Sequence, residues 1–203
     1  MPSINTLFWD VGGVLLSNAW DHHERQEAFT KFNLDSAAFE KRHAVIVSPF
    51  ETGEISLDEY LEQTVFYRER PFTRDEFKEF MYSCSKPKPD ALARARALVA
   101  SRKFGMGTIN NESRELNAFR IEKFGLRDIF EVFVSSCFVR LRKPDPQIYA
   151  LALDLVQRAP QECCFVDDRA VNLEPAKKLG MHVIQMQSHE QLTGELKKLG
   201  IAP

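Results

Sequence analysis

Short apolar runs separated by helical patterns are the strongest feature of the chain. Five runs are rich in residues that favour strands, at positions 6–9, 104–109, 130–134, 163–166 and 182–186. Between the later runs, apolar side chains recur at helical spacing over residues 113–124, 146–156 and 170–179, and Gly180 then acts as a helix stop signal. Strand and helix therefore alternate from about residue 86, which predicts an α/β fold with an open parallel sheet and helices on both faces.

Residues 17–85 interrupt this alternation, because they contain helical patterns without a convincing strand. The sequences SLDE, beginning at Ser56, and TRDE, beginning at Thr73, each fit a capping box, in which the hydroxyl and the acid satisfy free backbone N–H groups. Helices are therefore expected to begin near Leu57 and Arg74.

The interruption predicts two parts of the chain. We expect residues 1–16 and 86–203 to form the core, and residues 17–85 to form an inserted helical cap over the carboxyl edge of the sheet. The segment KPKPD, residues 86–90, is the one hinge candidate, since its prolines favour extended backbone.

The composition favours a small molecule or another protein as the partner. The 203 residues carry a formal net charge of -2, which gives no basic field for nucleic acid or for an anionic membrane surface. There is no run of about 18 apolar residues and no basic leader, so we expect a cytoplasmic protein without a membrane span or signal peptide. A homodimer is left open. The four cysteines lack the spacing of a disulfide framework or a metal site, so reduced core thiols are expected.

Polar residues follow four of the apolar runs, near the point where each predicted strand ends. In chain order they are Asp10, Asn110, Asn111, Lys143, Asp167 and Asp168. Each alone has an ordinary explanation as a turn asparagine, a solvated lysine or an aspartate that caps a helix. Ligands of parallel sheets gather at the carboxyl ends of the strands, so we expect these side chains to converge on one site.

This set of side chains suits phosphoryl chemistry. Adjacent carboxylates repel one another unless a divalent cation or a lysine lies between them, and carboxylate oxygens suit Mg²⁺. A bound metal, Lys143 and the amides can hold the oxygens of a phosphoryl group, while Asp10 stays free to attack phosphorus. Gly12 and Gly13 let the backbone approach an anion closely. The residues thus predict Asp10 as a nucleophile, Mg²⁺ as the cofactor and a small phosphorylated molecule as the substrate.

Four segments together resemble the successive motifs of the haloacid dehalogenase-like (HAD-like) hydrolase superfamily. They are FWDVGGVL, TINNESRE, LRKPDPQIYALAL and FVDDRAVNLEPAKKLGM, and the resemblance covers almost the whole chain. The branch that the chain resembles includes glucose-1-phosphatase-type sugar phosphatases and the N-terminal phosphatase domain of soluble epoxide hydrolases. The resemblance implies a three-layer Rossmann-like core with a small helical cap inserted after the first strand.

The same resemblance implies roles for individual residues. Mg²⁺ would be held by the Asp10 carboxylate, the Gly12 main-chain oxygen and Asp168, with Asp167 beside them. Lys143 matches the lysine that neutralises the nucleophile and the phosphate. Asn110 stands where the family usually has Ser or Thr, and Asn172 fits a position next to the metal ligands. We expect catalytic roles for Asp10, Lys143 and Asn110, and substrate contacts from Val11, Gly12, Asn110, Asn111 and Lys143.

Gly12 departs from the family pattern. Many phosphatases of the superfamily carry a second aspartate there, which moves a proton, and loss of a positioned acid costs about 10²–10⁴-fold in rate for a poor leaving group. Glycine also occurs at this position in the sugar-phosphatase branch. We expect the leaving group to depart unaided, as from a sugar 1-phosphate. Replacement donors would be Asp21, His22 or His23, although these residues also fit a solvated helix start.

Two other hypotheses stay open at this point. A 2-haloacid dehalogenase would use the same aspartate without a metal, but the acidic pair Asp167 and Asp168 would then be an electrostatic burden. A phosphate-binding module that has lost turnover is the second, and Gly12 is its main support.

Overall fold

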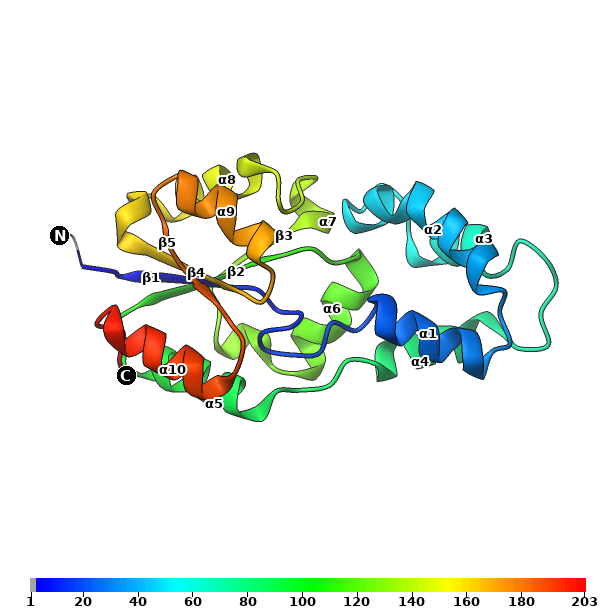
Figure 1. Ribbon diagram of the computed structural model, residues 1–203, viewed down its shortest axis with the longest axis horizontal. Helices are drawn as coiled ribbons and strands as arrows, with labels where there is room; N and C mark the ends of the chain where they lie inside the picture. Colours follow the sequence, from blue (N-terminus) through cyan, green and yellow to red (C-terminus); the bar gives the residue numbers. More distant parts are fainter. Residues whose placement is uncertain (1–2) are drawn as a thin grey trace.

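A twisted parallel sheet forms the centre of the molecule (Figure 1). The computed structural model describes residues 3–203, in which the strand order is β3-β2-β1-β4-β5. The strands are β1 (Thr6–Trp9), β2 (Gly105–Asn110), β3 (Val132–Ser135), β4 (Cys163–Asp167) and β5 (His182–Gln185). All neighbouring strands are parallel, which confirms the predicted open parallel sheet.

Helices cover both faces of the sheet and complete the three predicted layers (Figure 1). One face packs against α5 (Pro89–Ala100), α6 (Arg114–Lys123) and α10 (His189–Lys198), and the other against α8 (Pro146–Val156) and α9 (Ala170–Lys178). Alternate residues of β1 supply the two faces, since Leu7 and Trp9 belong to one apolar cluster and Phe8 to the other. Short helical turns complete the core at η1 (Leu126–Asp128), α7 (Ser136–Val139) and η2 (Pro160–Glu162).

Four helices between β1 and α5 lie beyond the carboxyl ends of the strands (Figure 1). They are α1 (His22–Lys31), α2 (Ser36–Glu51), α3 (Leu57–Thr64) and α4 (Arg74–Ser83). Both predicted capping boxes are present, with Ser56 and Glu59 starting α3 and Thr73 and Glu76 starting α4. These helices enclose an apolar cluster rich in aromatic side chains, to which Leu116 of α6 also contributes.

Two connecting segments, around Leu16 and around Pro87, join this helical segment to the sheet and run side by side. Leu16 and Pro87 form an antiparallel bridge, Ser17 N–H donates to Lys86 O at 2.8 Å, and Lys88 N–H donates to Leu15 O at 2.9 Å. The extended part of KPKPD ends at Lys88, because α5 begins with Pro89. Whether this segment acts as a hinge stays a prediction.

The cysteines are Cys84, Cys137, Cys163 and Cys164, and all four are buried free thiols, as the sequence predicts. Within residues 3–203, none of the helices combines the length and apolar character that a membrane span requires.

Candidate active site

Asp10 lies one residue beyond β1, at the carboxyl edge of the sheet. Its N–H donates to Val166 O at 2.8 Å, which extends the pairing of β1 with β4 and fixes the position of Asp10. The side chain is largely buried, and its Oδ1 accepts a hydrogen bond of 2.8 Å from Val11 N–H. Lys143 Nζ lies 2.9 Å from the same oxygen. The predicted nucleophile is therefore in direct contact with the predicted lysine.

Asp167, the last residue of β4, is held on several sides. Lys143 Nζ donates to its Oδ2 at 2.7 Å, and Asn172 Nδ2 lies 3.1 Å from both carboxylate oxygens. The N–H of Arg169 donates to Oδ1 at 2.8 Å. Lys143 thus bridges Asp10 and Asp167, and these donors leave Asp167 little capacity for another ligand.

Asp168 contributes a buried carboxylate oxygen, Oδ1, that has no donor in the described part of the chain. One oxygen of Asp10, one of Asp167 and one of Asp168 all lie within 4.8 Å of one another. A Cβ atom on Gly13, whose φ is +74°, would lie 2.1 Å from Asp168 Oδ2, so only glycine allows this close approach. A cluster of oxygen ligands with an unpartnered carboxylate oxygen fits a cation such as Mg²⁺.

The electrostatics of the acidic cluster also favour a bound cation. The pKa of Asp10 is raised to about 7, mainly by burial; the Lys143 ammonium opposes this rise and the Asp167 carboxylate contributes to it. Burial also raises the pKa of Asp168, with the Asp167 carboxylate as the next cause. The contact with Lys143 does not fully offset the cost of the buried carboxylates, and a divalent cation would supply the missing positive charge.

Asn111 positions Lys143 through the main chain. Its Nδ2 donates to Lys143 O at 2.9 Å, and its Oδ1 accepts from Lys143 N–H at 2.8 Å. Because both ends of the amide are used, Asn111 fixes the loop that carries the lysine. Asn111 also lines the pocket in front of Asp10.

Asn110 and Val11 do not line this pocket. The side chain of Asn110 is buried between Ser135 Oγ, which donates to its Oδ1 at 2.9 Å, and Asn117 Oδ1, which accepts from its Nδ2 at 3.2 Å. The N–H of Val11 is directed to Asp10. The expected substrate contacts of Asn110 and Val11 therefore stay predictions that rest on the family resemblance, and the hydrogen bonds of the Asn110 side chain do not support a direct one.

Gly12 lines the pocket at the place where many family members carry the second aspartate. A Cβ atom here would lie 3.2 Å from Asn18 Oδ1 and 3.7 Å from Arg120 Nη1. The Arg120 guanidinium is itself buried and pairs with Glu112 and with the main-chain oxygen of Ser17. Gly12 thus lies close to an arginine that the chain already pairs with a carboxylate.

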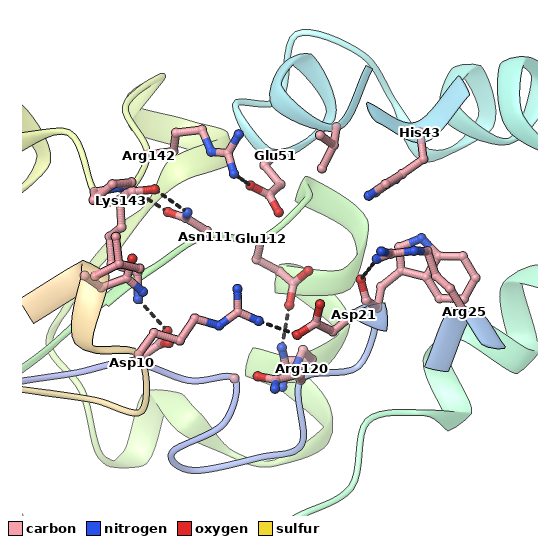
Figure 2. A pocket seen from close by; sticks show the side chains of 18 residues that line it. Asp10, Asp21, Arg25, His43, Glu51, Asn111, Glu112, Arg120, Arg142 and Lys143 are labelled. Carbon is pink, nitrogen blue, oxygen red and sulfur yellow. Dashed lines mark hydrogen bonds and ion pairs between the residues drawn. The ribbon is translucent and has the colours of Figure 1, made fainter. Parts of the chain in front are cut away.

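A cavity of about 340 Å³ lies in front of Asp10, between the strand ends and the helices α1 and α2 (Figure 2). The sequence reasoning missed most of its titratable lining: Arg25, His43, Glu51, Glu112, Arg120, Arg142 and Arg169. Glu112 and Arg169 directly follow Asn111 and Asp168, so their place after a strand end could have revealed them. Arg25, His43 and Glu51 carry no local signal, because only the packing of α1 and α2 brings them to the pocket.

The three candidate proton donors take different positions. Asp21 lines the pocket, but it also caps α1 in a capping box with Glu24 and pairs with Arg169. His22 and His23 are exposed on α1 and are not part of the pocket lining. These positions favour the interpretation of residues 21–23 as the start of a helix. They do not favour His22 or His23 as a proton donor.

Sequence comparison identifies relatives with different activities. The chain is 40% identical over 74 residues to bifunctional epoxide hydrolase 2 of Sus scrofa, a match that covers 36% of this chain and 13% of that protein. It is 28% identical over 162 residues to flavin mononucleotide hydrolase 1 of Arabidopsis thaliana, covering 80% of this chain and 65% of the relative. An (S)-2-haloacid dehalogenase of Xanthobacter autotrophicus is 29% identical over 124 residues, covering 60% of this chain and 48% of the relative.

Comparison with solved structures shows that the fold is that of HAD family enzymes. A HAD family enzyme from Bacteroides thetaiotaomicron, solved in complex with magnesium and inorganic phosphate, superposes with a TM-score of 0.72 at 21% identity. The match covers 91% of this chain and 95% of that one. The sequence profile of the haloacid dehalogenase-like hydrolases matches residues 4–180. The chain therefore belongs to the haloacid dehalogenase-like hydrolase family.

Proposed function

We propose that this hydrolase is a Mg²⁺-dependent phosphatase that cleaves small phosphomonoesters through an aspartyl-phosphate at Asp10. The observation that carries the proposal is the buried, unpartnered Oδ1 of Asp168 beside Asp10 and Asp167. A dehalogenase that uses Asp10 needs no cation, and the charge of this carboxylate cluster would then be compensated by Lys143 only in part. The acidic cluster thus favours a phosphatase over a dehalogenase.

The residues that would hold the metal are the Asp10 carboxylate, the main-chain oxygen of Gly12 and Asp168. When bound, Mg²⁺ supplies positive charge that draws the phosphoryl oxygens toward Asp10 and stabilises their charge during transfer. Asp167 acts through Lys143, because its own oxygens accept from Lys143, Asn172 and Arg169.

The reaction has two halves in this proposal. First, a carboxylate oxygen of Asp10 forms a bond to phosphorus as the bond from phosphorus to the leaving-group oxygen breaks, and that oxygen takes the electron pair. Water then forms a bond to phosphorus as the bond between phosphorus and the Asp10 oxygen breaks, which releases inorganic phosphate and restores the carboxylate. The proton that the water loses balances the one that the leaving-group oxygen takes from solvent. Lys143, 2.9 Å from Asp10 Oδ1, favours the ionised nucleophile and can donate to a phosphoryl oxygen.

The absence of a side chain at Gly12 restricts the substrate. The leaving group has to depart without a proton from this position, which favours esters whose leaving oxygen is more acidic than a simple alcohol. The anomeric oxygen of a sugar 1-phosphate meets this condition, so we propose a sugar 1-phosphate as the substrate class. The charged lining of the pocket also suits a hydroxylated molecule.

The relatives support this proposal without deciding it. One relative is named a flavin mononucleotide hydrolase, and one structural neighbour binds magnesium and inorganic phosphate. Another relative is named a haloacid dehalogenase, so the dehalogenase hypothesis keeps a specific argument in its favour.

One assay distinguishes the hypotheses. Phosphate release from p-nitrophenyl phosphate is measured with Mg²⁺ and with EDTA, and chloride release is measured from 2-chloropropionate. Mg²⁺-dependent phosphate release without chloride release is the expected result. Chloride release that EDTA does not affect would instead establish a dehalogenase, and phosphate binding without turnover would establish a phosphate-binding module.

Three further expectations stay predictions of the sequence. They are the division into a core of residues 1–16 and 86–203 with a cap of residues 17–85, a cytoplasmic location, and a homodimer.

A further inference from the structure

Three side chains form a hydrogen-bonded series in the wall of the pocket that lies opposite the nucleophile. Trp20 Nε1 lies 2.9 Å from the hydroxyl oxygen of Tyr60, and this oxygen lies 2.7 Å from Nδ1 of His43. Tyr60 is fully buried, whereas Trp20 and His43 line the pocket. Figure 2 shows His43 across the cavity from Asp10 and Lys143.

The series determines which nitrogen of His43 carries the proton. An indole N–H can only donate, so the Tyr60 oxygen accepts from Trp20. Among residues 3–203, the Tyr60 hydroxyl has His43 Nδ1 as its other partner. If Nδ1 carried a proton, the buried O–H of Tyr60 would have no acceptor, which is unfavourable. Nδ1 therefore accepts, and the proton of the neutral ring is on Nε2.

The surroundings of His43 keep the ring neutral and oriented. The pKa of His43 is lowered to about 4, first by burial and next by the Arg25 guanidinium, while the acidic Glu40 and Asp21 compensate only in part. The ring stacks on Phe39 with centroids 6.1 Å apart and an interplanar angle of 18°. His43 therefore offers the pocket a single fixed donor, Nε2–H, which carries no charge.

We propose that His43 is a specificity-determining residue whose Nε2–H donates a hydrogen bond to an oxygen of the leaving group. Tyr60 and Trp20 are then positioning residues that fix the tautomer. This inference rests on the proposed function, because a phosphoryl group held at Asp10 and Lys143 directs the rest of the substrate toward the wall that carries His43.

The same wall also provides an acceptor. Glu51 lines the pocket from α2, the helix that carries His43, and pairs with Arg142 at 2.7 Å. A neutral donor and a carboxylate acceptor on one wall fit neighbouring hydroxyl groups, which both donate and accept. The leaving group that this wall fits is a polyhydroxylated one, as in a sugar phosphate.

The tautomer is tested without any assay of activity. NMR spectra of protein labelled with ¹⁵N-histidine distinguish protonated from unprotonated ring nitrogens near neutral pH. The chain has five histidines, and the spectrum of His43→Leu identifies the signals of His43. We expect an unprotonated Nδ1 in the wild type and a mixture of tautomers in Tyr60→Phe. Tyr82→Phe, which removes a hydroxyl outside the pocket lining, is the matched control and leaves the signals unchanged.

The contact with the leaving group is tested by substrate preference. The ratio of kcat/KM for α-D-glucose 1-phosphate to kcat/KM for acetyl phosphate is measured, because the acetyl group carries no hydroxyl. Loss of one hydrogen bond to the sugar lowers this ratio by about tenfold in His43→Leu. Tyr60→Phe lowers it by less, because part of the rings in the tautomer mixture keeps Nε2–H. His43→Gln keeps an N–H donor and recovers part of the ratio, and Tyr82→Phe keeps the ratio of the wild type.

The outcomes separate the inference from the proposed function. A protonated Nδ1 in the wild type, or equal losses of kcat/KM for both esters, overturns the inference and leaves the phosphatase intact. Failure of the wild type to hydrolyse either ester with Mg²⁺ overturns the proposed function, and with it the role of His43 in binding a leaving group.

Discussion

At the residue scale, Lys143 divides the three acids into two kinds. It contacts Asp10 and Asp167 directly, whereas the free oxygen of Asp168 has no protein donor among residues 3–203. In the proposed function Asp10 attacks phosphorus, Asp167 supports the lysine and Asp168 binds the metal, and each proposed role predicts a different mutant.

Asp10→Asn is expected to abolish turnover while the fold is retained. The amide has nearly the same shape as the carboxylate, but it is neither a nucleophile nor a good Mg²⁺ ligand. Phosphate release and thermal unfolding are measured on the same preparation. More than about a few per cent of wild-type kcat in a folded variant would exclude the covalent mechanism, since removal of a nucleophile costs orders of magnitude in rate.

Asp168→Asn is expected to raise the Mg²⁺ concentration needed for half-maximal activity. The increase should be at least about tenfold, because even an outer partner of a metal ligand contributes that much to metal affinity. Asp167→Asn is the matched control, and it should lower kcat by disturbing Lys143 with a smaller effect on the metal titration. The reverse pattern would show that Asp167 is the direct ligand.

Gly12→Asp tests the missing proton donor. The position is outside the left-handed region of φ, and the nearest atom to a new Cβ is a side-chain oxygen 3.2 Å away, so the variant should fold. A carboxyl group here should raise kcat for a simple alkyl phosphate by roughly tenfold, a part of the 10²–10⁴-fold that positioned acids supply. Gly12→Asn has almost the same size and cannot give a proton. Equal rates for the two variants would mean that the absent acid does not limit the reaction.

At the element scale, the helix starts are the most predictable features. SLDE and TRDE are local patterns, and α3 and α4 begin at Leu57 and Arg74 as the capping boxes predict. Strand bounds moved by one or two residues, because the apolar runs at 104–109 and 130–134 include residues that pack in the core outside the hydrogen-bonded ladder.

The local sequence predicts only one of the two roles of Asp21. Its side chain caps α1, and it also lines the pocket. As the N-cap of α1 and the partner of Arg169, it stabilises the start of the helix. Asp21→Ala should lower the free energy of unfolding by about 1 kcal/mol, the usual value of an N-cap. His22→Ala and His23→Ala alter exposed side chains and should change it by less than about 0.5 kcal/mol. Urea unfolding measures these values, and an unchanged stability of Asp21→Ala would contradict the capping role.

At the scale of the whole molecule, the candidate site combines parts that differ in how far the sequence reveals them. Asp10, Lys143, Asp167 and Asp168 lie at or beyond the carboxyl ends of β1, β3 and β4, so a parallel sheet brings them to one edge and the sequence predicts their meeting. The wall formed by Arg25, His43 and Glu51 depends on how α1 and α2 pack across that edge. No local pattern encodes this packing, so the sequence predicts a leaving group from Gly12 but does not reveal the wall that would contact it.

The central claim is that Asp10 becomes phosphorylated during turnover. The protein is mixed with acetyl phosphate and Mg²⁺, quenched in acid and treated with borohydride, which reduces an aspartyl-phosphate to homoserine. Peptide mass spectrometry then locates the reduced residue. The account predicts homoserine at position 10, dependent on both Mg²⁺ and the ester. An unmodified Asp10 in samples that release phosphate, or a modification at another carboxylate, would contradict it.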